Sequence, residues 1–179
     1  MDFLDILREK AFIGREFLTW LWFKTDQTGG RIELSKGNIM QCVFLDKMTL
    51  DLADAESPQA VILKGEHSEL REGRAALREG KKIEEAKVSI HNGYNEFTMV
   101  LKATWFAFGS FKPPTTLTRG EAGEEEGPEG AFLEKVSLIE EGLEAVDGMF
   151  ERFLRLRVSD AWETVELPAI RKWIAANHG

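Results

Sequence analysis

Cysteine, histidine and proline are scarce in this chain of 179 residues. Cys42 is its one thiol, which excludes an internal disulfide and any zinc or iron–sulfur site built from several thiolates. The three histidines are scattered, and none belongs to a metal-spaced pair. The chain also lacks the glycine-rich phosphate loops, the dinucleotide fingerprint and the nucleophile elbow. We therefore expect no metal, no cofactor and no enzymatic activity.

Long apolar runs are absent as well. No stretch approaches the roughly 18 apolar residues of a membrane span, and the start carries Asp2 and Asp5 where a secretory leader carries positive charge. We expect a cytoplasmic protein without a membrane partner. Five Trp, twelve Phe and 30% charged residues are typical of a globular chain, and the length suits one domain.

The net charge of -8 is distributed unevenly. Residues 64–112 hold nine basic and seven acidic groups, whereas residues 113–179 hold seven basic and fourteen acidic groups. An acidic average argues against nucleic acid as a partner, but the local basic excess keeps that possibility open. The segment from Lys64 to Lys102 is therefore the part of the sequence most suggestive of an anionic ligand.

The pattern of apolar residues predicts an α+β fold. A first helix precedes Gly14, and a second, GREFLTWLWFKTDQ, ends at Gly29-Gly30. The apolar surface around Trp20 and Trp22 belongs in the core or at a contact between subunits, and we favour the core. An antiparallel sheet of about five strands follows, with RIELS, IMQCVFL, MTLDL and AVILK as early strands.

Asn92-Gly93 predicts a hairpin with a two-residue type I′ turn. With His91 opposite Tyr94, the register is fully specified. The expected partners on the apolar face are Val88 with Phe97 and Ala86 with Met99, and on the polar face they are Lys87 with Thr98 and Ile83 with Lys102.

Composition divides the chain into three parts. Residues 1–112 form the α+β domain, 113–130 a linker rich in Gly and Glu, and 131–179 a C-terminal helical segment that packs on the same domain. A homodimer would use the Trp20/Trp22 helix or the C-terminal helices.

Two further groups of residues have competing interpretations. The acidic residues Asp46, Asp51, Asp54 and Glu56 suit a two-metal nuclease, but solvated loop acids are the favoured interpretation because no histidine or basic residue completes the site. The aromatic residues Trp105, Phe106, Phe108 and Phe111 suit a stacking platform for single-stranded bases, although we favour a place in the core. Cys42, in an apolar run, is expected to be a buried small side chain.

The segment from Ser68 to Glu79 is predicted to form a helix whose charges are sorted by face. Three arginines share one stripe and three glutamates lie on the far side: Arg71, Arg74, Arg78 and Glu69, Glu72, Glu79. Like charges at this spacing repel by roughly 0.2–0.5 kcal/mol per pair. Either the stripe meets an anionic partner, or tertiary neighbours and the helix dipole compensate the charges. Both interpretations remain open.

Lysines extend this basic character onto the hairpin. Phosphate contacts made by such residues give binding that depends on salt and not on sequence. The candidate DNA-binding residues are Arg71, Arg74, Arg78, Lys81 and Lys82, with Lys64, Lys87 and Lys102 at the margin.

The order of these features resembles the bacterial recombination-associated RdgC family. The residues that carry the resemblance are FLTWLWFKTDQTGGRIEL, LREGRAALREGKKIEEAKVSI and NEFTMVLKATWFAFGSFKPP, between about Phe17 and Pro113. The resemblance implies nonspecific binding of duplex DNA by a ring-shaped homodimer, an association with the nucleoid, and a role in restraining RecA. Members of the family carry a longer portion before the Leu-Thr-x-Trp helix, so the closed ring is not carried over to this chain. We expect a nonspecific DNA-binding protein or, as the alternative, a protein-interaction or oligomerisation module.

Overall fold

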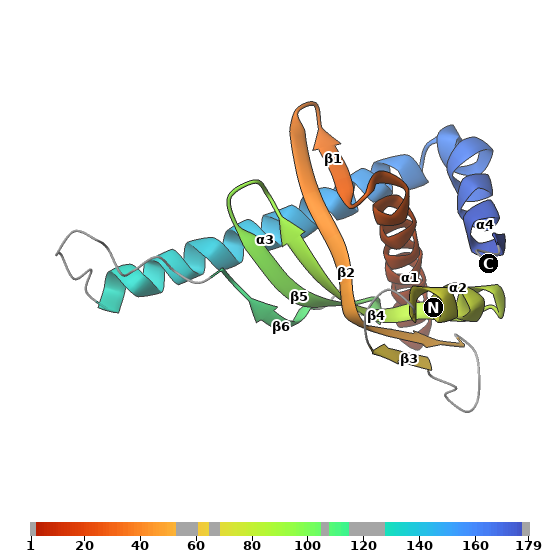
Figure 1. Ribbon diagram of the computed structural model, residues 1–179, viewed down its shortest axis with the longest axis horizontal. Helices are drawn as coiled ribbons and strands as arrows, with labels where there is room; N and C mark the ends of the chain where they lie inside the picture. The colour runs from red at the N-terminus through yellow and green to blue at the C-terminus, as the bar shows by residue number, and fades with distance from the viewer. Residues whose placement is uncertain (1–2, 53–60, 65–68, 105–107, 115–127, 177–179) are drawn as a thin grey trace.

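The computed structural model describes residues 3–52, 61–64, 69–104, 108–114 and 128–176 (Figure 1). Its centre is a six-stranded antiparallel sheet, which confirms the predicted α+β class. The strands are β1 (Arg31–Ser35), β2 (Asn38–Asp51), β3 (Val61–Lys64), β4 (Lys82–His91), β5 (Glu96–Lys102) and β6 (Phe108–Lys112). They follow the order β1-β2-β4-β5-β6, with β3 paired to the far half of β2.

Helices pack on one face of this sheet. They are α1 (Phe3–Thr28), α2 (Glu69–Arg78), α3 (Pro128–Arg157) and α4 (Leu167–Ala175), and a single π-helical turn, η2 (Trp162–Glu166), precedes α4. Their buried side chains share one core with the inward residues of β2, β4 and β5. The core forms because apolar residues alternate along the strands and recur at helical spacing along the helices. None of the described helices is long and apolar enough to cross a membrane.

The strand β2 differs from the expectation. Two separate runs, IMQCVFL and MTLDL, were predicted as two strands, but the chain continues through both. The pairing with β4 shifts between Phe44 and Met48, and this irregularity divides β2 into two halves. One half pairs with β1 and the other with β3, so a single long strand has a different neighbour at each end.

The predicted register of the β4–β5 hairpin is wrong by two residues. His91 pairs with Glu96 rather than Tyr94, and Val88 pairs with Met99 rather than Phe97. The other expected pairs shift likewise: Ala86 pairs with Leu101, Lys87 with Val100, Glu85 with Lys102, and Ile83 with Leu50 of β2.

The side chain of Asn92 explains this shift. Its Oδ1 accepts hydrogen bonds from the backbone N–H of Tyr94 (3.0 Å) and of Asn95 (2.8 Å), which closes a four-residue loop in place of a two-residue turn. Because the shift is an even number of residues, the side chains between Ala86 and Met99 keep the faces that were predicted for them. Ile83 is the exception: it was predicted on the polar face, but the pairing of β2 with β4 shifts before it and its side chain is buried in the core. The apolar side chains of Val88 and Phe97 are fully buried.

The predicted interruption at Gly14 is also wrong, because α1 runs unbroken from Phe3 to Thr28. A Cβ atom at Gly14 would lie 2.2 Å from the carbonyl oxygen of Ala103. The glycine therefore marks a close contact between the helix and the sheet region, and not a helix end.

The C-terminal helices pack against α1 through ring contacts, a hydrogen bond and an ion pair. The Phe17 ring of α1 lies 5.3 Å from Phe150 and 5.6 Å from Phe153, both on α3. The indole N–H of Trp20 donates to Glu166 at 3.0 Å, and Lys24 pairs with the same carboxylate at 2.5 Å. The buried Glu166 thus joins two ends of the chain that are far apart in sequence.

Trp20 and Trp22 lie in the core, as favoured from the sequence. Their side chains are 0% and 2% exposed within a single chain. A contact between two copies therefore has to use other residues than these two rings.

Candidate nucleic-acid interface

The helix α2 and the turn after it place four basic residues close together. Gly80 has a positive φ of 91° and ends the helix, while its N–H bonds to Leu77 O and the Lys81 N–H bonds to Ala76 O, both at 3.1 Å. The turn leads directly into β4 at Lys82. The basic side chains here belong to Arg74, Arg78, Lys81 and Lys82. Those near the end of α2 also suit the negative end of the helix dipole.

The members of the predicted arginine stripe have different surroundings. The Arg74 guanidinium is half-buried, and its Cζ lies 5.8 Å from the centre of the Trp173 ring on α4. Arg78 and Lys82 are exposed, and Lys81 is half-buried. The side chain of Arg71 lies outside the described part of the chain.

The helix α4 adds two basic residues that the sequence prediction missed. It contacts α2, and it carries the exposed Arg171 and Lys172 without any acidic residue between Leu167 and Ala175. The sequence did contain a signal for them, because the segment LPAIRKWIA has two basic residues and no acidic one, whereas the rest of the C-terminal part is acidic.

We call residues 72–82 and 167–175 together the α2–α4 corner. They contain six basic and two acidic residues, in a chain with a net charge of -8. The corner is therefore a positively charged region of an acidic protein. Such a region attracts phosphates and other anions.

The predicted marginal lysines lie elsewhere, on strands of the sheet. The Lys87 ammonium pairs with Asp46 at 2.8 Å, and this hydrogen bond lowers the pKa of the Asp46 carboxyl. Lys102 pairs with Glu85 at 3.2 Å, and Lys47 approaches the same carboxylate at 3.7 Å. Each of the two predicted lysines, Lys87 and Lys102, thus has an acidic partner on the neighbouring strand. The side chain of Lys64 lies outside the described residues.

The acidic residues considered for a metal site are not gathered together where they are described. Asp46 faces Lys87, and the Asp51 carboxylate accepts the Leu52 N–H at 2.8 Å. Asp54 and Glu56 lie outside the described residues. In the part of the chain that the structure describes, no three potential ligands form a group that could hold a metal ion.

The remaining candidate groups have separate locations. Cys42 is fully buried in β2, and burial raises the pKa of its thiol to about 12, as suits an unreactive core residue. Phe111 is half-buried and its ring lies 6.2 Å from Phe97, so it packs with the core. Phe108 is exposed on β6, while Trp105 and Phe106 lie outside the described residues.

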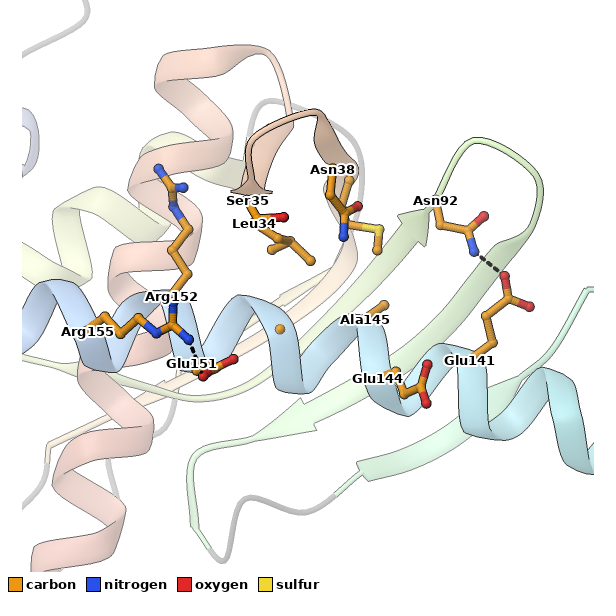
Figure 2. Close-up of a pocket in the computed structure, with 12 residues that line it drawn as sticks. Leu34, Ser35, Asn38, Asn92, Glu141, Glu144, Ala145, Glu151, Arg152 and Arg155 are labelled. Atoms are coloured by element: carbon orange, nitrogen blue, oxygen red, sulfur yellow. Dashed lines mark hydrogen bonds and ion pairs between the residues drawn. The ribbon is translucent and has the colours of Figure 1, made fainter.

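A cleft of about 440 Å³ lies where α3 meets the tips of two hairpins (Figure 2). Asn92 and Asn95 donate to the two oxygens of Glu141 in its wall. The arginines in the wall also have partners, because Arg155 pairs with Glu151 at 2.6 Å and Arg152 donates to the carbonyl of Glu33. The polar groups of the cleft therefore mainly join the hairpins to α3, and the cleft has no excess of positive charge.

The chain matches no known family model, no curated protein and no solved structure.

Proposed function

We propose that this protein binds DNA without sequence preference, through phosphate contacts made by the α2–α4 corner. The observation that carries the proposal is the gathering of six basic residues on α2, its C-terminal turn, the first residue of β4 and α4. Long flexible cations on a surface suit the phosphate backbone, which every DNA sequence presents in the same way. The contacts come from Arg74, Arg78, Lys81, Lys82, Arg171 and Lys172.

Fluorescence anisotropy with two unrelated labelled duplexes tests the proposal. We expect equal affinity for both and a steep decrease in affinity as salt rises, because each phosphate contact adds about 0.9 to the slope of log affinity against log salt. A slope near zero, or a strong preference for one duplex, would contradict the proposal.

The resemblance to the RdgC family extends the proposal to recombination. A protein that coats duplex DNA without sequence preference hinders the pairing step of RecA, and it would be found with the nucleoid. A strand-exchange assay measures this effect. We expect inhibition by the wild-type protein and none by a variant in which the corner lysines and arginines are changed to glutamine.

A second candidate function is protein interaction, and one observation favours it. The N-terminal part of α3 extends beyond the sheet in Figure 1, where Phe132 and Leu133 are 65% and 66% exposed. Adjacent exposed apolar side chains are typical of contact surfaces. Sedimentation separates the two functions: a self-association that F132E/L133E abolishes, and that the similarly exposed control V165E retains, would favour this second candidate.

A further inference from the structure

The Trp173 side chain contacts three residues of α1. It is buried and lies edge-on to Trp22, with 5.0 Å between the ring centres and an interplanar angle of 90°. A second edge-on contact, at 5.7 Å, is with Phe23. The indole N–H donates to the Asp26 carboxylate at 2.7 Å. These contacts determine both the position and the tilt of the ring.

One ring therefore connects three helices, because Arg74 of α2 lies over the Trp173 ring of α4 at 5.8 Å while residues of α1 contact the same indole. A guanidinium that stacks on an aromatic face keeps its donors in a plane, directed outward from its edge. Such an arrangement restricts the long Arg74 side chain to few conformations.

We propose that Trp173 is a positioning residue for the anion site and fixes the orientation in which the Arg74 guanidinium meets a phosphate between α2 and α4. This inference rests on the proposed function. A fixed side chain loses less conformational freedom when it binds, so the same contact gives a tighter complex. By reciprocity, a bound duplex stabilises the docked position of α4.

The competing explanation is that Trp173 only fills the core and that Arg74 only covers it. Long side chains commonly shield an apolar ring in this way. In that case, changes at Trp173 alter stability, but they leave the contribution of Arg74 to DNA binding unchanged. The two explanations therefore differ in whether the effects of Arg74 and Trp173 on affinity depend on each other.

A double-mutant cycle on the full chain tests the inference, with anisotropy of a fluorescein-labelled mixed-sequence duplex as the readout. We expect R74Q and W173L each to lower affinity about tenfold, and the double variant to bind no more weakly than R74Q. Each variant should also lower the salt slope by about 0.9. W173F keeps an aromatic face and should bind almost like the wild type.

The possible results separate the inference from the function it rests on. If W173L keeps wild-type affinity and slope while R74Q loses both, the positioning role is wrong and the proposed function stands. If the wild-type protein does not bind the duplex, the proposed function fails and the inference fails with it. Should W173L not fold, R74K decides: it keeps the charge but lacks the planar group, so we expect about threefold weaker binding. Unchanged affinity of R74K would overturn the inference.

Discussion

The α2–α4 corner and the sheet carry similar cations in different electrostatic surroundings. On the strands, Lys87 and Lys102 each pair with an acid on the neighbouring strand: Lys87 pairs with Asp46 of β2, and Lys102 pairs with Glu85 of β4. In the corner, basic residues outnumber acidic ones by six to two. A count of charges along the sequence therefore does not give the surroundings of each cation. Strand pairing places acids opposite Lys87, Lys102 and, at the edge of the corner, Lys82, whose partner residue is Asp51, whereas helix packing brings the basic residues of α2 and α4 together.

The largest expected difference concerns stability, and it compares Glu166, which directly precedes the α4 part of the corner, with Glu85 of the sheet. Glu166 is buried and serves both Trp20 and Lys24, so E166A leaves two polar groups without their partner and should lower the free energy of unfolding by about 3 kcal/mol. Glu85 is partly exposed, and E85A should cost less than about 1 kcal/mol. Urea titrations measure both values. Equal losses would show that Glu166 does not fasten the C-terminal helices to α1.

The next difference concerns DNA affinity. Changing the four corner residues Lys81, Lys82, Arg171 and Lys172 to glutamine should weaken binding about 100-fold, because several phosphate contacts disappear. The matched control changes four lysines of the sheet, Lys47, Lys87, Lys102 and Lys112, to glutamine, and it alters the net charge by the same amount. We expect a loss below about threefold for the control, measured by anisotropy at one fixed salt concentration. Similar losses in both variants would mean that net charge, and not the corner, governs binding.

The smallest effect is a pH dependence on the sheet. The hydrogen bond from Lys87 lowers the pKa of Asp46 in the folded protein, so this pair contributes stability above the pKa of an unfolded aspartate. The contribution is lost as pH falls through the lowered folded pKa. A carboxyl-carbon NMR titration should show Asp46 titrating below the usual aspartate range, and K87Q should return it toward that range. An unchanged titration in K87Q would remove Lys87 as the cause.

The β4–β5 hairpin shows which structural features local sequence patterns can predict and which they cannot. Alternation of apolar residues predicted which side chains face the core between Ala86 and Met99, because that depends only on the period of a strand. It failed for Ile83, where the pairing of β2 with β4 is irregular. The register depended on hydrogen bonds from the Asn92 side chain, and the Asn-Gly pair alone did not reveal them. Gly14 is a similar case. A side chain at this position would clash with the backbone of Ala103, and the sequence does not reveal that contact because the two residues are far apart along the chain.

The candidate site was predicted in part for the same physical reason. The arginine stripe was predicted from helical periodicity, and Lys81 and Lys82 were predicted as basic residues of the hairpin that follows the helix. The basic character of α4 could be seen in the sequence, but its position beside α2 could not, because that position depends on contacts of Trp173 with Trp22 and Asp26, which are far away in the sequence. The pairing of Lys87 with Asp46 likewise depends on which strands become neighbours.

Mapping amide chemical shifts by NMR while DNA is added distinguishes binding at the α2–α4 corner from binding along the sheet. We expect the amides of residues 78–82 and 171–172 to shift progressively, while those near Lys87 and Lys102 stay in place. The opposite pattern, with shifts along the sheet and none in the α2–α4 corner, would contradict the proposal.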